Sequence, residues 1–319
     1  MKAAIRYQYG SPDRIRIEDL QKPAPQDNEV LVKVHAATVN RTDCANLTAK
    51  PFIMRFVLGF FKPAKVILGT DLAGEIEAVG KNIQDFKVGD RVFGFNDTGL
   101  ESQAEYTAII PWNAALQTIP ENISYQEAAA SLEGAHYAYT FMQKSKLKPG
   151  QKGLINGASG AIGSALLQFM KQYDLKVAVT CGTGNIELMR SLGADEVFDY
   201  TKEDFTKKSA TYDFIFDAVG KSTFDKCKPL LKKGGIYISS EPGPYIQNVF
   251  FALFSSFMSK KVIFPVPLSR TKSLSYIKEL LEKQKFQPVI DRKYQLSEIT
   301  DAYRFVMSGQ KTGNVVIDI

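Results

Sequence analysis

The segment GLINGASGAIG, residues 153–163, decides the fold, because it joins a short apolar run to a helical pattern through closely spaced glycines. We expect a strand at residues 153–156, a helix at 162–173 and a second strand at 176–180. A strand, a glycine-rich turn, a helix and a strand in this order are typical of a dinucleotide-binding unit. Without that context, three glycines in seven residues are also compatible with a purely structural turn.

Each glycine of this turn has an expected role. Gly157 permits the tight turn, Gly160 lets backbone N–H groups approach a pyrophosphate, and Gly163 lets the helix pack closely on the sheet. The N-terminus of the helix adds partial positive charge. These roles predict a nucleotide cofactor at the end of the first strand.

The sequence after this unit continues to alternate between strands and helices. Such alternation predicts a parallel, doubly wound sheet and an α/β fold class. The further expected elements are helix 186–192, strands 196–198 and 214–217, helix 223–231 and strand 235–239.

Residues 1–121 have a different pattern. The sequence EVLVKVHAATV, residues 29–39, alternates apolar and other residues as a half-buried strand does, and a polar loop is expected at 40–43. Short strands at 74–79 and 91–95 are separated by glycine turns, which indicates a compact β domain. Ser124 and Glu127 then form a capping-box pattern that opens a helix extending to about residue 142.

The C-terminal part contains an amphipathic helix from Ser273, a strand around Val289, a helix at 297–307 and a last strand at 315–319. A strand that follows the doubly wound unit most simply returns to the first domain. We therefore predict a β domain at 1–121, a nucleotide-binding domain at 122–265 and a return to the first domain at 266–319.

The composition indicates an ordinary folded protein. The chain has 319 residues with 45% hydrophobic residues, and 40 Lys and Arg against 34 Asp and Glu give a net charge of +6. The basic residues are scattered, which favours a solvated surface over a nucleic-acid footprint. The apolar stretches 52–61 and 249–258 are too short to span a membrane. Three cysteines without a CxxC pattern, and an N-terminus without a signal peptide, predict a reducing, cytoplasmic location.

The end of the second strand bears on the choice of cofactor. Sites for NAD usually carry Asp or Glu there, whereas this chain reads TCGT at residues 180–183. Thr183, Asn185 and Tyr200 could instead donate hydrogen bonds to a 2′-phosphate. NADPH is therefore the predicted cofactor.

Five motifs resemble the medium-chain dehydrogenase/reductase superfamily, and together they look like its quinone oxidoreductase branch. The motifs are GTDLAGEIEAVG (69–80), FKVGDRVFGF (86–95), GASGAIG (157–163), SLGADEVFDY (191–200) and KTGNVVIDI (311–319). TCGTGNIELMRSLGADEVFDY (180–200) and MSKKVIFPV (258–266) are most similar to the chloroplast envelope homologues and their bacterial relatives. The resemblance implies a GroES-like catalytic domain, a Rossmann domain and NADPH-dependent reduction of quinones or α,β-unsaturated carbonyls.

The zinc alcohol dehydrogenases of the same superfamily read Gly-His-Glu where this chain reads GTD at residues 69–71, and no four-cysteine lobe follows Phe95. We expect His35 and His136 to be packed or hydrogen-bonded rather than metal ligands, so no metal is predicted. The chloroplast relatives carry an Arg where this chain has Gly184. Arg190 or Lys311 could supply that charge, or either could be a solvated surface residue.

The resemblance also implies candidates for catalysis. Asn40 and Asp43 match the family's Asn-x-x-Asp next to the nicotinamide, although both residue types also cap turns and helices. Tyr137 could donate a proton or belong to the core. The apolar stretch 52–61 falls where the family has a substrate-lining loop, but it could equally be a buried helix. If it lines the pocket, the substrate is large and apolar, such as a quinone or a long enone.

The expected function is hydride transfer from NADPH to a quinone or an enone. The alternatives are a zinc-free alcohol or aldehyde oxidoreductase and a non-enzymatic NADPH-binding protein with a crystallin-like or RNA-binding role. An apolar small-molecule substrate and a homodimer are expected. The predicted cofactor-binding residues are Gly157, Ala158, Ser159, Gly160, Ala161, Ile162, Thr180, Cys181, Gly182, Thr183, Asn185, Tyr200, Ala218, Val219, Gly220, Lys311 and Asn314.

Overall fold

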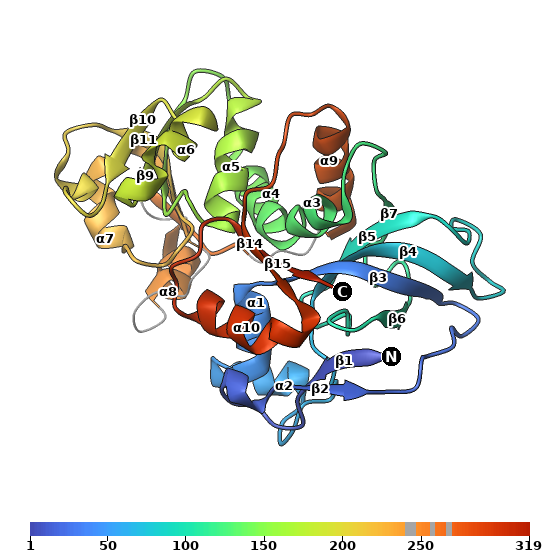
Figure 1. Ribbon diagram of the computed structural model, residues 1–319. Coiled ribbons are helices and arrows are strands. Elements are labelled where there is room, and N and C mark those ends of the chain that lie inside the picture. Colours follow the sequence, from blue (N-terminus) through green and yellow to red (C-terminus); the bar gives the residue numbers. More distant parts are fainter. Residues whose placement is uncertain (240–246, 256–258, 266–269) are drawn as a thin grey trace. The chain divides into compact units, whose positions relative to one another are not determined.

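The computed structural model describes residues 1–239, 247–255, 259–265 and 270–319. The chain divides into two compact units (Figure 1). The first unit comprises Met1–Glu133, Arg270–Lys283 and Pro288–Ile319, and the second comprises Gly134–Ser269 and Gln284–Gln287. The sequence predicted the first boundary after residue 121, whereas the two units meet after Glu133. The expected boundary at 266 and parts of the stretches 249–258 and 258–266 lie outside the described residues.

The first unit is built mainly of antiparallel strands. Its strands are β1 (Lys2–Ile5), β2 (Arg16–Asp19), β3 (Val30–Val39), β4 (Asp71–Val79), β5 (Arg91–Phe95), β6 (Tyr106–Ile109), β7 (Gln117–Thr118), β14 (Ile290–Gln295) and β15 (Asn314–Asp318). Its helices are η1 (Pro12–Arg14), α1 (Arg41–Thr48), η2 (Phe52–Met54), α2 (Arg55–Leu58), α3 (Tyr125–Ala130), α9 (Arg270–Glu282), η8 (Leu296–Glu298) and α10 (Ile299–Met307).

Strand β3 organises the larger sheet of this unit. The order is β14-β15-β3-β4-β5-β7, with β6 also paired to β3, while β1 and β2 form a separate two-stranded sheet. The C-terminal strand β15 pairs antiparallel with β3, Val315 opposite Val39, so the chain returns to its first unit as expected from the sequence (Figure 1). Helix α10 covers this region, with Tyr303 and Val306 in the same buried cluster as Val315.

Three expectations for the first half of the chain need correction. Residues 41–43, expected in a polar loop, begin helix α1, because Asn40 and Asp43 form a local cap. The single helix expected up to residue 142 is two helices, α3 and α4 (Glu133–Ser145), which a turn at Ser131 separates. For the apolar stretch 52–61, the alternative of a buried helix is wrong, because only Leu58 within it is buried; the alternative of a substrate-lining loop stays a prediction.

The second unit alternates strands and helices. After α4, whose first residue belongs to the first unit, its elements are β8 (Lys152–Asn156), α5 (Ala161–Lys171), β9 (Lys176–Cys181), η3 (Thr183–Asn185), α6 (Ile186–Ser191), β10 (Glu196–Asp199), η4 (Phe205–Lys207), β11 (Tyr212–Asp217), α7 (Phe224–Cys227), η5 (Lys228–Leu230), β12 (Leu231–Ser239), α8 (Gln247–Phe254) and β13 (Lys261–Ile263). The helix expected at 223–231 is thus shorter, because β12 already begins at Leu231.

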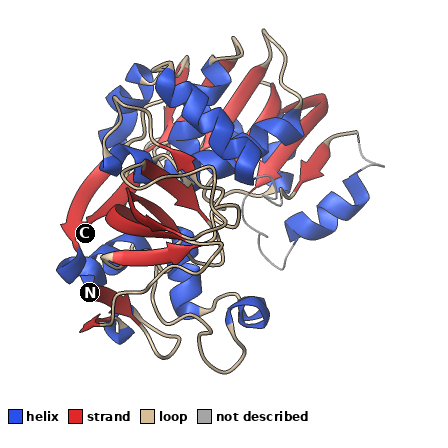
Figure 2. Cartoon of the chain, turned by 90° about the vertical axis from the view of Figure 1, so that its right-hand side faces the viewer, coloured by secondary structure: helices blue, strands red, loops and turns tan. Residues whose placement is uncertain are grey.

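The six strands of the second unit form one parallel sheet in the order β10-β9-β8-β11-β12-β13, with helices beside it (Figure 2). The chain fills the sheet outward from β8 in both directions, which is the strand order of a Rossmann fold. This confirms the predicted doubly wound α/β class. The strand order reverses between β8 and β11, and ligands of such sheets bind outside the carboxyl ends of the strands at this point.

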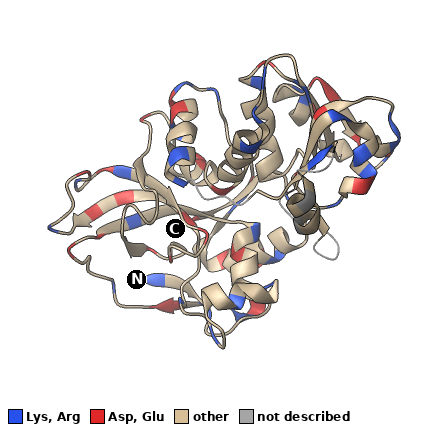
Figure 3. Ribbon diagram, turned by 180° about the vertical axis from the view of Figure 1, so that it is seen from behind, with Lys and Arg blue, Asp and Glu red and all other residues tan. Residues whose placement is uncertain are grey.

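Over most of the described chain, charged residues of both signs are mixed; the stretch between Asp43 and Asp71, which carries only basic residues, is an exception. Lys and Arg are interspersed with Asp and Glu along the ribbon of each unit (Figure 3). In the part of the chain that the structure describes, no helix is both long and apolar enough to cross a bilayer.

Candidate active site

A buried polar network fixes the switch point of the parallel sheet. Asn156 and Asp217 end the paired strands β8 and β11, and the Asn156 amide donates to the Asp217 carboxylate at 3.0 Å. Thr180 at the end of β9 donates to Asn156 Oδ1 at 2.8 Å. The Thr180 hydroxyl in turn accepts the Gly157 N–H at 3.0 Å. The network ties three strand ends to the start of the glycine turn.

Two glycines of the turn are required by the packing of the protein itself. Gly157 has a φ of +80°, and a Cβ there would lie 2.4 Å from Val219. A Cβ on Gly163 would lie 2.5 Å from the carbonyl oxygen of Gly157 and 2.6 Å from Ala158. Gly163 therefore allows α5 to pack against its own turn, whereas the sequence had suggested packing on the sheet.

Gly160 differs from these two glycines. Its φ of −76° and ψ of 171° are open to any residue, and a Cβ there would find no atom nearer than the Gly157 oxygen at 3.6 Å. Gly160 is also the residue that caps the N-terminus of α5. A side chain at this position would project into free space before the first N–H groups of the helix, where a phosphate is stabilised. The protein alone does not require this glycine, but an anion bound at the turn would.

The loop after β9 carries the groups that we expect around a 2′-phosphate. Thr183 is exposed, but its hydroxyl donates to Asp199 Oδ2 at 2.6 Å, so this proton is already engaged. Tyr200 is 59% exposed, and its hydroxyl lies beside Gly182. Gly184 has no atom within 4 Å of the position of a Cβ, so the missing arginine leaves open space.

The Asp199 carboxylate is engaged in hydrogen bonds within the protein, which disfavours it as a ribose ligand. Its carboxylate accepts from Thr183, from the Thr201 hydroxyl at 2.6 Å and from the Thr201 N–H at 3.0 Å. The Thr183 and Thr201 hydrogen bonds lower the pKa of Asp199 to about 2. The Asp199 carboxylate therefore anchors the loop that follows β9. Arg190, one candidate for the missing charge, is exposed and pairs with Glu187 at 2.6 Å.

Further predicted cofactor residues of the second unit lie at the same strand ends, whereas Ala161 and Ile162 begin α5 and Asn185 ends η3. Residues 218–220 directly follow β11, and the Asp217 carboxylate accepts the Gly220 N–H at 2.9 Å. Cys181 is buried at the end of β9, and burial raises the pKa of its thiol to about 11. The thiol is thus neutral at physiological pH and unsuited to nucleophilic chemistry.

In the first unit, Asn40 lies in a buried network at the start of α1. Its amide nitrogen donates to the Thr38 hydroxyl at 2.5 Å and to Asp71 Oδ2 at 2.9 Å. Asp71 also accepts the Thr38 N–H at 2.8 Å. Because both amide hydrogens of Asn40 are used, the structure does not favour Asn40 as the donor to a substrate carbonyl.

Asp43 plays the local capping role that the sequence had left as an alternative. Its Oδ2 accepts the Asn40 N–H at 2.8 Å. The carboxyl group is fully buried, and burial, followed by the nearby charges of Asp71 and Glu133, holds its pKa well above the usual range. Asp43 therefore stabilises the α1 N-terminus, and its own negative charge is costly there.

Glu133 is the functional candidate that the sequence reasoning missed. This residue begins α4, is 7% exposed, and its Oε1 accepts the Thr42 hydroxyl at 2.7 Å. Burial raises the pKa of Glu133 to about 8, while the Thr42 hydrogen bond acts in the opposite direction. Its Oε2 is buried without a hydrogen-bond partner. At neutral pH the carboxyl group is therefore largely protonated, with Oε2 the free oxygen to carry the proton.

The two C-terminal candidates also belong to the first unit. Lys311 donates to the Gly313 carbonyl, and burial lowers its pKa, an effect that the charge of Glu133 opposes. The Asn314 amide donates to the Val289 carbonyl at 3.0 Å. Asn314 thus has a structural role between strands in this unit. The glycine turn belongs to the second unit.

The aromatic and histidine candidates are packed. Tyr137 is half-buried on α4, with its ring 5.7 Å from that of the fully buried His136. His35 on β3 stacks on Tyr125 at 4.4 Å, and burial lowers its pKa. Both histidines lie as packed imidazoles. Within the described residues no group of three His, Cys, Asp or Glu side chains is arranged to hold a metal ion.

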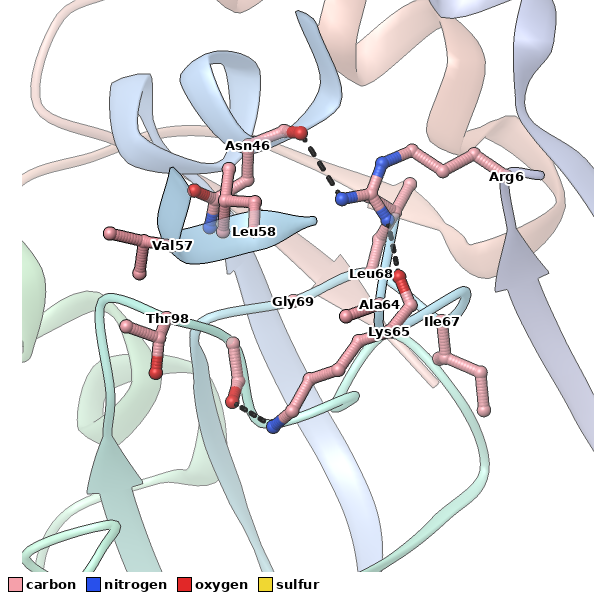
Figure 4. A pocket seen from close by; sticks show the side chains of 11 residues that line it. Arg6, Asn46, Val57, Leu58, Ala64, Lys65, Ile67, Leu68, Gly69 and Thr98 are labelled. Atoms are coloured by element: carbon pink, nitrogen blue, oxygen red, sulfur yellow. Dashed lines mark hydrogen bonds between the residues drawn. The ribbon is translucent and has the colours of Figure 1, made fainter. Parts of the chain in front are cut away.

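A pocket of about 340 Å³ lies in the first unit (Figure 4). Arg6 reaches into its wall and donates to the Lys65 carbonyl at 3.0 Å and the Asn46 carbonyl at 3.1 Å. Val57 and Leu58 of the apolar stretch form part of the lining. The other apolar side chains of that stretch are not among the residues that line this pocket.

Comparison with known families matches both units. Residues 26–149 match the alcohol dehydrogenase GroES-like domain, and residues 192–317 match the zinc-binding dehydrogenase domain. The chain is also similar to the quinone oxidoreductase of Coxiella burnetii, with a TM-score of 0.88, 26% identity and coverage of 100% of this chain and 99% of that one.

Curated relatives are similar over nearly the whole chain. The 2-methylene-furan-3-one reductase of Solanum lycopersicum is 32% identical over 99% of this chain and 79% of its own. The NADPH-dependent alkenal/one oxidoreductase of Arabidopsis thaliana is 31% identical with the same coverage. The quinone-oxidoreductase homologue of Spinacia oleracea is 31% identical over 97% of this chain and 95% of its own. The chain belongs to the medium-chain dehydrogenase/reductase superfamily, within its quinone oxidoreductase branch.

Proposed function

We propose that this protein is an NADPH-dependent oxidoreductase that reduces quinones or α,β-unsaturated carbonyl compounds. The observation that carries the proposal is the glycine turn at the switch point, where Gly160 leaves space for an anion that the protein itself does not fill. The activities for which the relatives are named, alkenal/one oxidoreductase and quinone oxidoreductase, support the substrate class.

The second unit supplies the groups that would hold the cofactor. The backbone at Gly160 and Ala161 would hold the pyrophosphate at the N-terminus of α5, since this is where unpaired N–H groups and the helix dipole favour an anion. The exposed Tyr200 and the space at Gly184 would accommodate the 2′-phosphate. When bound, the reduced nicotinamide supplies the hydride.

Reduction of a conjugated carbonyl also requires a proton after hydride transfer. Glu133 suits this role, because its pKa of about 8 keeps a proton on the carboxyl group at neutral pH. Thr42 fixes the carboxyl group through Oε1, so the proton resides on Oε2. We propose Glu133 as the source of this proton, and Tyr137, half-buried on the same helix, as the competing candidate.

The test of the function is oxidation of NADPH, followed by its absorbance, with a quinone, an enone and a simple aldehyde in parallel. We expect turnover with the quinone or the enone and little with the aldehyde. Binding of NADPH without turnover of any of the three would instead favour a non-enzymatic role.

The proton source is tested by the pH dependence of kcat. The rate of the wild type should fall as pH rises through about 8, because Glu133 then loses its proton. Glu133→Gln should remove this descending limb and lower kcat by about tenfold to a hundredfold, as expected for lost general-acid catalysis. If Tyr137→Phe removes the limb and Glu133→Gln does not, the assignment of Glu133 is wrong.

We further propose a homodimer, which sedimentation velocity would detect as a species of twice the mass of the chain. A monomer at all concentrations would exclude it.

A further inference from the structure

An exposed apolar surface stands out in the first unit at KPFIMRFVLGFFKPAK, residues 50–65. We call its outward-facing residues the apolar tip. Their exposed fractions lie between 44% and 89%. The tip consists of Phe52, Ile53, Phe56, Val57, Phe60 and Phe61.

So many exposed apolar side chains close together in the sequence are unusual for the described residues of this unit. In its described residues, the other exposed large apolar side chains are single ones, at Tyr7, Val88, Trp112 and Met307. Single exposed apolar side chains are ordinary, whereas a contiguous group marks a contact surface. We therefore expect the apolar tip to contact a partner.

The tip is held in a defined conformation. Phe60 is central, with ring centroids 5.9 Å from Phe52, 5.5 Å from Phe56 and 5.0 Å from Phe61. The backbone is closed by the hydrogen bond from the Ala64 N–H to the Leu58 carbonyl at 2.8 Å, and Leu58 is buried beneath it. The rings are thus presented without the ordering cost of a flexible loop.

Polar contacts anchor the base of the tip to the rest of the unit. The Tyr9 hydroxyl donates to the Gly59 carbonyl at 2.8 Å. Arg55 lies over the Tyr9 ring at 5.1 Å and over the Phe52 ring at 5.6 Å. The basic group at the centre of the segment is therefore fixed beside the aromatic rings.

The charge of the segment has one sign. Lys50 and Lys62 are exposed, Arg55 is half-buried, and no Asp or Glu occurs between Asp43 and Asp71. Lys65 is also exposed, but its ammonium group donates to the Gly99 carbonyl at 2.7 Å. Basic side chains therefore border the apolar tip on both sides in the sequence. An apolar group bordered by lysines is complementary to a surface with an apolar interior and anionic headgroups.

We propose that the apolar tip docks this protein on the surface of a bilayer that contains anionic lipids. The rings enter the headgroup region, where aromatic side chains are favoured, and Lys50 and Lys62 contact the lipid phosphates. The segment is too short to cross the bilayer, so the contact is peripheral and reversible. This inference is independent of the proposed reaction, because it rests on the exposed residues 50–65 alone.

The test is co-sedimentation of the full chain with vesicles of phosphatidylcholine alone, or with about 30% phosphatidylglycerol, chosen as a strongly anionic surface. We expect binding to the anionic vesicles, weaker binding to the neutral ones, and a loss of at least about fivefold in affinity at about 0.5 M salt, where charges are screened. Equal affinity for both kinds of vesicle would contradict the role of the lysines.

Two pairs of variants isolate the two components. Phe56→Glu with Phe61→Glu should weaken binding at least about tenfold, because charged groups are disfavoured among acyl chains. Val88→Glu with Trp112→Glu, which places the same two charges at isolated exposed positions, is its control. Lys62→Gln should weaken binding to anionic vesicles only, by about fivefold for the loss of roughly 1 kcal/mol per basic residue. Lys87→Gln is the matched control.

The outcomes are distinct. The variants should unfold at the same temperature as the wild type, because the altered side chains are exposed. This measurement shows that they are folded. Vesicle binding that survives Phe56→Glu with Phe61→Glu would overturn the proposal. It would also be overturned if the wild type ignores vesicles and forms a dimer that this double variant abolishes, since a second copy of the chain would then cover the tip.

Discussion

Replacement of Glu133 by Gln tests whether a protonated carboxyl group is built into the first unit. The side chain keeps its shape, and the Thr42 hydroxyl can still donate to the remaining oxygen. What changes is the ability to ionise. An ordinary glutamate has a pKa of 4.5, and burial raises that of Glu133 to about 8, a difference of 8 − 4.5, or about 3.5 pH units.

The sign of the effect on stability follows from proton linkage. Between pH 4.5 and about 8 the folded protein keeps the Glu133 proton and the unfolded chain has lost it, so the free energy of unfolding falls as pH rises. At about 1.4 kcal/mol per unit, the full difference is about 5 kcal/mol, an upper value that structural relaxation around the charge would lower to roughly 2–3 kcal/mol. Below pH 4.5 the contribution vanishes.

We therefore expect Glu133→Gln and the wild type to be similarly stable near pH 4.5, and the variant to become progressively more stable than the wild type up to pH 8 or 9. Urea unfolding at a series of pH values measures this difference. Asp43 and Asp71, which also have raised pKa values, titrate in both proteins, and the pKa of Asp43 should be lower in the variant because the charge of Glu133 that helps to raise it is removed. Glu121→Gln, at an exposed position, is the matched control. Parallel curves for wild type and Glu133→Gln would refute the reasoning.

Three further predictions concern the cofactor and the metal. Gly160→Val should weaken NADPH binding at least about a hundredfold, because the side chain fills the anion site. The free energy of unfolding should fall by only about 1 kcal/mol, because valine is a poorer helix cap. Unchanged binding by titration would show that the turn is merely structural. Gly184→Arg places a guanidinium in open space and should raise the affinity for NADPH about tenfold over that for NADH, whereas an equal gain for both cofactors would place the new charge away from the 2′-phosphate. Activity should survive treatment with a chelator, because Thr70 and Asp71 occupy the positions of the usual ligand pair, and zinc that is lost together with activity would contradict this.

The fold of the second unit was accessible from the sequence because its signals are local. The run 153–163 contains a strand end, a positive-φ glycine and a helix start within eleven residues, and each element then depends on its neighbours in the chain. The start of α3 was equally predictable from the sequence, since Ser124 and Glu127 form the capping box that their spacing predicts. Where the sequence erred, at the start of α1, Asn40 and Asp43 looked like loop residues because caps and loops use the same side chains.

The site depends on partners that are distant in the sequence. Thr183 looked like a free donor to a phosphate, but its proton goes to Asp199, sixteen positions later, which only the pairing of β10 with β9 brings near. Glu133 looked like an ordinary helix-start glutamate. Its partner Thr42 is ninety-one positions away, and its burial follows from the fold of the first unit. An acidic residue within a long alanine-rich run was the signal that could have revealed it.

The contrast between Gly160 and Gly163 shows how structure separates two residues that sequence treats alike. Both belong to one motif, yet a Cβ at Gly163 would meet backbone atoms at 2.5 Å, whereas one at Gly160 would find only open space out to 3.6 Å. Loss of Gly163 should therefore damage folding, and loss of Gly160 should damage binding. A glycine that its own protein does not need, at the end of a helix where anions are stabilised, is explained by a ligand that approaches the backbone closely.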